Sequence, residues 1–387
     1  MELSRTKSAN CQRAGRVATA WMVACNRGLP IRDTTPSSLS KMVIRGAIAF
    51  MAMLLLLSFA GAQKKAPEKS QAKSQKNNIA TSPPRVSLSP RFSPGQSFRY
   101  AMEFETTTAT SQSGLAKDPQ GPSKLVITWD ATILLEVLPT EASAPGSIRL
   151  RTTYEKSTAH VTSDTFDPAA AATEEQYQKL EGKAVEFTLD ASGKVISVSG
   201  LPEIVDGEKA VQAAREWIAQ LDTGSGAPAG GVTVGQTWSS EQPASLPVAG
   251  MVWRTESEYL RDEVCHPPNP EAPPAPSSAE SAANPELPET CAVILTRLNL
   301  VRPKPVRNST PEEYRKSGVQ TAGKWEGSAQ SLSYISLRTG LAVSVTQTGT
   351  EEMHVTLTTQ HNASMRYAGT ILSRSQVALV ADDPHGK

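Results

Sequence analysis

Apolar and polar residues alternate over several long stretches of this chain, which is the pattern of half-buried β-strands. The longest row places apolar side chains at every second position of Leu125–Val137, and shorter rows occupy Phe98–Phe104 and Ile148–Tyr154. A hairpin is expected at Val185–Val198, with Gly193 in its turn. Further strands are predicted at Thr233–Ser239, Met251–Val264, Cys291–Val301, Ala322–Leu337, Leu341–Thr348, Met353–Thr359 and Met365–Val380.

One segment has a helical period instead. In Glu208–Leu221, Val211, Ala214 and Ile218 fall on one face, which Trp217 widens, while the opposite face is charged. Such a helix must cover something apolar, most simply the open face of a sheet. The predicted fold is therefore mainly β: two similar antiparallel halves forming a curved sheet or half-barrel, with one amphipathic helix packed against it.

The two halves are expected because three short landmarks recur in the same order, at offsets of 140, 137 and 147 residues. The first and third are turn motifs, and the second is a Thr-x-x-Glu/Gln capping box that would open a short helix. The predicted halves are residues 91–200 and 232–381, joined by the helix and glycine-rich connector 201–231. The matched segments are Gly95–Phe98 with Gly235–Trp238, Thr173–Tyr177 with Thr310–Tyr314, and Asp190–Gly193 with Leu337–Gly340.

The segment Met42–Ala62 has the layout of a secretory signal peptide: a basic start, an apolar run and a small-residue end. Residues 1–41 then form an upstream extension of a chain whose translation starts at Met42. An alternative is an uncleaved membrane anchor through residues 46–62, which is short of the roughly 20 apolar residues that span a bilayer comfortably. Residues 63–90 are polar and are predicted to be a disordered linker. Export to a periplasmic or extracellular location is expected.

Two of the four cysteines, Cys265 and Cys291, follow the leader and bracket a proline-rich insert, residues 266–290. A matched pair in an exported chain predicts a disulfide. A metal site at Cys265, His266 and Cys291 is the alternative, but no fourth ligand stands at a recognisable spacing.

The charge balance argues against nucleic acid as a partner. Of 39 basic and 38 acidic residues, eight and two respectively lie in positions 1–62, so the remainder has a net charge of −5. Nucleic-acid binding needs a concentrated basic face. A membrane would be a partner only through an uncleaved leader.

No recognisable catalytic motif is present, and we assign no catalytic residue, metal ligand or cofactor. The string Thr223–Gly226 lacks nucleophile-elbow spacing, and Ser70–Lys73 falls in the predicted linker. The acidic pair Glu351-Glu352 is expected at a hairpin tip, and His354 is expected to face solvent.

Candidate ligand-binding residues are the tryptophans Trp129, Trp217 and Trp253. They fit either the lining of an apolar cavity or plain core. A carrier would have a continuous cavity lined by Trp217 and the Leu125–Val137 row.

The motifs at Gly95–Phe98, Gly235–Trp238 and Asp190–Val195 resemble those of a loose group of bacterial exported proteins of unknown function. The resemblance implies a β-rich envelope protein and assigns no functional residue. The layout is also similar to the lipoprotein-carrier fold, at the level of fold alone. The leading hypothesis is a non-enzymatic exported protein that binds an apolar ligand or an envelope protein. A structural or protein-interaction module and a hydrolase without a recognisable motif are the alternatives.

Overall fold

The structure is a computed structural model, and it describes residues 85–114, 122–139, 146–165, 168–190, 195–200, 227–228, 230–244, 246–265, 289–360 and 363–380. The predicted leader 42–62, the linker before residue 85, the helix Glu208–Leu221 and residues 266–288 of the insert lie outside these ranges.

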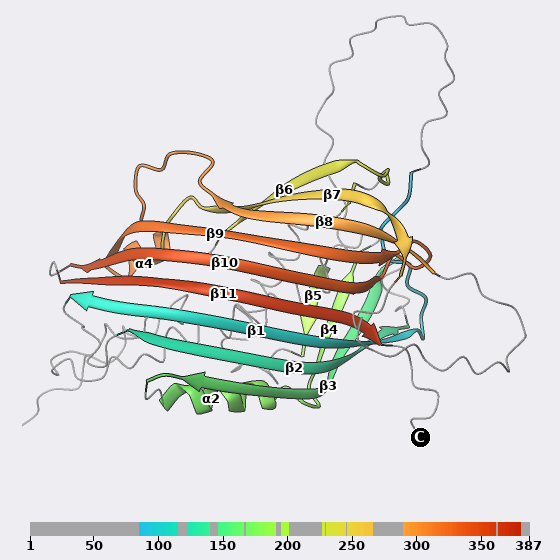
Figure 1. Cartoon of the computed structure of the whole chain (residues 1–387), viewed down its shortest axis with the longest axis horizontal. Helices are drawn as coiled ribbons and strands as arrows, with labels where there is room; N and C mark the ends of the chain where they lie inside the picture. The colour runs from blue at the N-terminus through green and yellow to red at the C-terminus, as the bar shows by residue number, and fades with distance from the viewer. Residues whose placement is uncertain are drawn as a thin grey trace, which may run out of the picture.

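One antiparallel sheet of 11 strands dominates the described residues (Figure 1), so the mainly β prediction is confirmed. Its spatial order is β5-β4-β3-β2-β1-β11-β10-β9-β8-β7-β6. The strands are β1 (Ser97–Gly114), β2 (Ser123–Leu138), β3 (Ile148–Ser163), β4 (Ala184–Leu189), β5 (Val195–Ser199), β6 (Thr237–Pro243), β7 (Val252–Val264), β8 (Thr290–Val301), β9 (Val319–Ser336), β10 (Ala342–Thr359) and β11 (Ser364–Val380). Two helices are described, α2 (Pro168–Gln178) and α4 (Glu312–Lys316).

The first and last strands pair in the middle of the sheet. From β1 the chain steps outward through β2, β3 and β4 to β5 at one edge, and from β6 at the other edge it steps back to β11. Strand β11 then pairs with β1 from Arg99↔Val380 to Gly114↔Met365. Each run places a helix after its third strand, α2 after β3 and α4 after β8.

The two Gly-Gln turns that open β1 and β6 have the same hydrogen bonds. The Gly95 amide donates to the Val137 carbonyl at 2.8 Å, and the Gly235 amide donates to the Tyr259 carbonyl at 2.6 Å. Both glycines have positive φ, +85° and +80°, which glycine adopts without steric cost.

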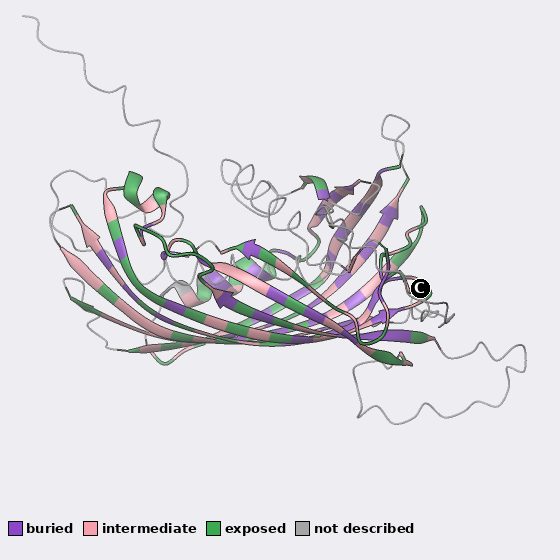
Figure 2. Cartoon of the chain, turned by 90° about the horizontal axis from the view of Figure 1, so that it is seen from above, coloured by how far each residue is buried: buried purple, intermediate pink, exposed green. Residues whose placement is uncertain are grey.

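Alternation separates the two faces of the sheet. The face that carries Tyr100, Met102, Phe104 and Trp129 is buried, and Tyr177 of α2 packs in the same apolar cluster. We call this the inner face. Figure 2 shows the long strands bowed into a trough with α2 on its hollow side.

The opposite, outer face is polar and carries ion pairs that join neighbouring strands or, for Arg99 and Glu155, reach across β2 from β1 to β3. Three of them join Arg99 to Glu155 at 2.8 Å, Arg151 to Glu186 at 2.7 Å, and Arg254 to Glu241 at 2.8 Å. Exposed pairs of this kind add little stability. They do place charge on this side of the sheet. The sheet therefore has an apolar inner face and a polar outer face.

The structure corrects the predicted hairpin tip at Glu351-Glu352. The two strands predicted at Leu341–Thr348 and Met353–Thr359 are one continuous strand, β10. Glu351 is paired with both neighbours, opposite Gly327 of β9 and Ile371 of β11. Glycine and acidic residues are poor strand formers, but backbone pairing on both sides outweighs that local preference. His354 is exposed, as predicted.

The predicted capping box at Thr173 does not form, and Thr310 of the second predicted box bonds to the sheet. Helix α2 begins at Pro168, so Thr173 lies inside the helix and is buried. The Thr310 hydroxyl bonds the backbone of Thr321 on β9, donating to its carbonyl at 3.1 Å and accepting from its amide at 2.9 Å. Thr173 is therefore used for packing rather than for a helix end, and Thr310 anchors its segment to the sheet.

Candidate functional site on the inner face of β7–β11

A row of polar side chains crosses the inner face. Ser375, Gln347, Ser331, Thr296 and Ser257 stand directly opposite one another on five successive strands, β11 to β7. Residues opposite one another in an antiparallel ladder point to the same face, so their side chains form one line across the sheet. All except Thr296 are buried. We call these five residues the polar row.

Apolar clusters lie on either side of the polar row along the strands. The disulfide-end cluster consists of Leu88, Val232, Tyr259, Ala292, Ile294 and Ile335. The α4-end cluster consists of Val248, Met251, Leu300, Trp325, Met353, Val355 and Leu357. On β8 and β9 the sequence passes from one cluster, through the polar row, into the other. The inner face is therefore amphiphilic along its strands.

A hollow of about 60 Å³ lies where the polar row meets the disulfide-end cluster. It has room for several water-sized groups, since one water needs roughly 10–15 Å³ of such space. Part of its wall is already hydrogen-bonded, because the hydroxyls of Ser257 and Thr296 lie 3.0 Å apart. Its wall includes Leu88, Trp238, Ile294, Leu298, Ser331 and Gln347.

Two hydroxyls on the inner face have no hydrogen-bond partner within the described structure. They are Thr108 Oγ1 on β1 and Ser240 Oγ on β6. A buried hydroxyl without a partner costs free energy, about 1–3 kcal/mol. Polar groups of this kind are available to a bound molecule that carries its own donors and acceptors.

Glu351 is the notable ionisable group of the inner face. It is half-buried, and the indole N–H of Trp325 donates to its Oε2 at 2.8 Å. Burial raises the pKa of the Glu351 carboxyl above 4.5, and the Trp325 hydrogen bond opposes that rise. Side chains two residues apart on a strand share a face, so the sequence places Glu351 on the face of Met353, Val355 and Leu357. The hairpin-tip interpretation did not use this signal.

The predicted tryptophan candidates lie in different places. Trp129 is fully buried beneath α2, where its indole N–H donates to Ser157 Oγ at 2.9 Å and its ring centroid lies 5.1 Å from that of Tyr177. Trp253 is half-buried and packs against the α4-end cluster. Trp217 lies outside the described residues, so a ligand role for these three stays a prediction. The hollow is bounded instead by Trp238, which the alternation pattern did not single out.

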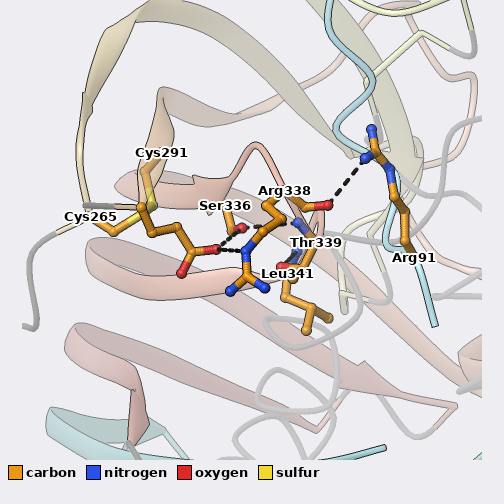
Figure 3. Close-up of polar contacts among 8 residues, drawn as sticks. Arg91, Cys265, Cys291, Ser336, Arg338, Thr339 and Leu341 are labelled. Carbon is orange, nitrogen blue, oxygen red and sulfur yellow. Dashed lines mark hydrogen bonds and ion pairs between the residues drawn. A yellow bond between two sulfur atoms is a disulfide. The ribbon is translucent and has the colours of Figure 1, made fainter. Parts of the chain in front are cut away.

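The predicted disulfide is present and closes the β7–β8 hairpin (Figure 3). Cys265 and Cys291 are bonded, with their Cα atoms 5.0 Å apart. Closing a loop of this length stabilises the fold by about 3–4 kcal/mol, in the chain-entropy account. Beside the disulfide, Glu289 accepts from Ser336 and lies 3.5 Å from Arg338. This network ties the hairpin to the β9–β10 turn.

The described histidines lie at the surface, each beside a single carboxylate. Within the described ranges, no three His, Cys, Asp or Glu side chains gather as metal ligands would. His160 and His354 are exposed and lie near Glu174 and Glu352 at 3.8 and 2.9 Å. Neither α2 nor α4, the helices that are described, has the length and apolar character to cross a bilayer.

Comparison with known proteins gives only weak similarities. No model of a known protein family matches the sequence, and neither does any curated protein. A structure concerning lipid–protein interactions in lipovitellin has a TM-score of 0.39 at 12 % identity, covering 75 % of this chain and 26 % of that one. This chain thus spans about a quarter of the length of the lipovitellin chain.

Two further similarities are weaker still. DynF from the dynemicin biosynthesis pathway of Micromonospora chersina has a TM-score of 0.16 at 8 % identity, covering 82 % of this chain and 95 % of DynF. The outer membrane protein OprG from Pseudomonas aeruginosa has a TM-score of 0.12 at 6 % identity, covering 74 % and 98 %. At these scores no function transfers, so function has to be inferred from the residues of the inner face.

Proposed function

We propose that this protein is exported and binds an amphiphilic molecule on the inner face of β7–β11, without carrying out chemistry on it. The observation that supports this is the polar row between two apolar clusters, with a hollow at one of its borders. A ligand with a hydrogen-bonding group and a hydrocarbon part would match both surfaces at once. Binding sites commonly combine an apolar lining with a few placed polar groups.

Export is supported by the Cys265–Cys291 disulfide and by the leader-like segment Met42–Ala62. Disulfides form and persist in oxidising compartments. The polar, ion-paired outer face suits contact with water, which leaves the inner face for an apolar ligand or an envelope partner.

We also infer that the two runs of strands derive from one duplicated unit. The matching Gly95 and Gly235 turns and the helix after each third strand support this. The two units differ in their helices: the 11 residues of α2 pack along β3, with Tyr177 against Trp129 of β2, whereas α4 has five residues and packs on β9. The ligand site is therefore placed in the second unit.

The test is binding of dodecanol to the secreted form of the protein, followed by tryptophan fluorescence and native mass spectrometry. Dodecanol combines a hydroxyl group with a flexible alkyl chain. The variant Ser331→Val fills part of the hollow with a β-branched residue that suits a strand. We expect it to weaken dodecanol binding by about tenfold or more, a change equivalent to about 1.4 kcal/mol.

The matched control is Ser328→Val, which changes an exposed serine on the outer face of the same strand. Circular dichroism and urea unfolding establish that both variants are folded. Equal binding by the two variants, or no dodecanol binding by the unmodified protein, would overturn the proposal.

A further inference from the structure

Among the described residues, Glu351 is the single charged residue on the inner face of the five adjacent strands from β1 to β8. Following the pairing register, the inner positions of β1, β11, β10, β9 and β8 contain no other Asp, Glu, Lys, Arg or His within the described ranges. Its polar contact is the Trp325 indole N–H, and no cation of the described residues pairs with it. A half-buried carboxylate without a cation is costly to the fold, and such groups are concentrated at functional sites.

Two indole rings border the carboxylate. Trp325 is buried and donates to Glu351, and Trp253 approaches from β7 across Gly327. A Cβ atom added at Gly327 would lie 2.7 Å from Trp253 Cη2 and 3.2 Å from Glu351 Cγ. The two side chains therefore converge above a glycine that has no side chain to separate them. Carboxylates and indole rings are both groups that bind organic cations.

Small residues connect this place to the hollow. On β10, Gly349 separates Gln347 from Glu351, and on β9, Ala329 separates Ser331 from Gly327. Four residues of strand span about 13 Å, so Glu351 stands roughly that far from the polar row. That distance suits an amphiphile whose extended alkyl chain lies along the strands.

We propose that Glu351, with Trp325 and Trp253, binds the amine head group of a cationic amphiphile whose hydrocarbon chain lies along the inner face. This names the ligand class of the proposed function and rests on it. The ammonium group would donate to the carboxylate and lie against the indole rings. A charge-assisted bond of this kind is roughly twice as strong as a neutral one.

The pairing of Glu351 with an ammonium group depends on pH. Glu351 must be ionised to bind an ammonium group, and burial raises its pKa above 4.5. The other titratable groups at inner positions of β7, β9 and β11 are Tyr259, Asp262 and Tyr367. Tyr259 donates to Asp262, and burial raises the pKa of Tyr367 to about 12, so that phenol stays neutral. Preference for an amine should disappear when acid protonates Glu351.

The experiment compares dodecylamine, dodecanol and dodecanoate, three ligands with 12-carbon chains and different head groups. At pH 8 we expect the unmodified protein to bind dodecylamine about tenfold more tightly than dodecanol, and dodecanoate most weakly. The variant Glu351→Gln keeps an oxygen acceptor for the Trp325 N–H but removes the charge. It should bind dodecylamine and dodecanol equally, as should the unmodified protein at pH 4.

The control variant Glu352→Gln changes the next residue, which is exposed on the outer face and pairs with His354 at 2.9 Å. It should retain the preference for dodecylamine. If dodecanol binds but dodecylamine has no advantage, or if Glu351→Gln retains the advantage, the amine site is wrong and the amphiphile site stands. If no dodecyl ligand binds, both proposals fail.

Discussion

At the scale of single residues, burial of a carboxyl group favours its neutral, protonated form over its charged form. Burial raises the pKa of Glu351 in the folded protein, so the folded state holds the proton more tightly than the unfolded chain does. The free energy of unfolding therefore falls as pH rises from below the ordinary pKa of 4.5 to above the raised value.

We therefore predict that Glu351→Gln raises the free energy of unfolding of the ligand-free protein, by an amount that depends on pH. At pH 7 the variant should unfold at a higher urea concentration than the unmodified protein, because it no longer buries a charge. The gain should shrink as the pH is lowered toward 4. Urea unfolding at several pH values measures it. A constant difference across pH, or an equal gain in Glu352→Gln, would show that the buried charge is not the cause.

At the scale of elements, helix α2 and the turn that follows it protect a free strand edge. Strand β4 pairs with β3 only from Ile148 to Thr153, so the amides beyond that point need other partners. Glu181 accepts from the Ser157 amide at 3.2 Å, and Glu174 accepts from the Val161 amide at 3.2 Å. Uncovered strand edges recruit other chains, and natural proteins commonly cover or charge them.

Replacing both carboxylates, as in Glu174→Ala/Glu181→Ala, should therefore have two effects. The free energy of unfolding should fall by about 1–3 kcal/mol, since two hydrogen bonds to charged acceptors are lost. Self-association should rise with protein concentration in sedimentation velocity. Glu175→Ala, which removes an exposed partner of Lys179, is the control and should change neither. A monomeric double variant would show that these two carboxylates do not protect this edge.

At the scale of the whole molecule, the two runs of strands share one core. The largest apolar cluster contains Tyr100 and Trp129 from the first run and also Leu341, Val345 and Val377 from the second. Strands β1 and β11 are paired over 16 positions. Separating the two runs would therefore break this pairing at the centre of the sheet.

We therefore expect the described sheet to unfold as one cooperative unit. Urea transitions followed by tryptophan fluorescence and by far-ultraviolet circular dichroism should coincide, and residues 91–200 expressed alone should not form a stable sheet. Two separated transitions, or a cooperatively folded 91–200 fragment, would show that the runs are independent domains.

Much of the strand pattern could be predicted because alternation is a local property. The row from Leu125 to Val137 became β2, and the paired cysteines became the disulfide. The errors came where local preference was overruled from a distance. Gly349 and Glu352 suggest a turn, but pairing with β9 and β11 keeps β10 extended through them.

The candidate site was harder to predict for a physical reason. The polar row takes one residue from each of five strands, and only the register of their pairing brings Ser257, Ser331 and Ser375 into line. A one-residue change in register would move any strand's contribution to the outer face. The meeting of Trp253 with Glu351 above Gly327 likewise brings β7 against the β9–β10 hairpin.

The sequence by itself determined that the chain is mainly β, which residues of each strand share a face, and which two cysteines could bond, because these depend on composition and on a two-residue period. The tertiary structure alone decided the order of the strands, the pairing of the first with the last, and the placing of one carboxylate among indole rings. Those depend on contacts between residues far apart in the chain, which no local pattern encodes.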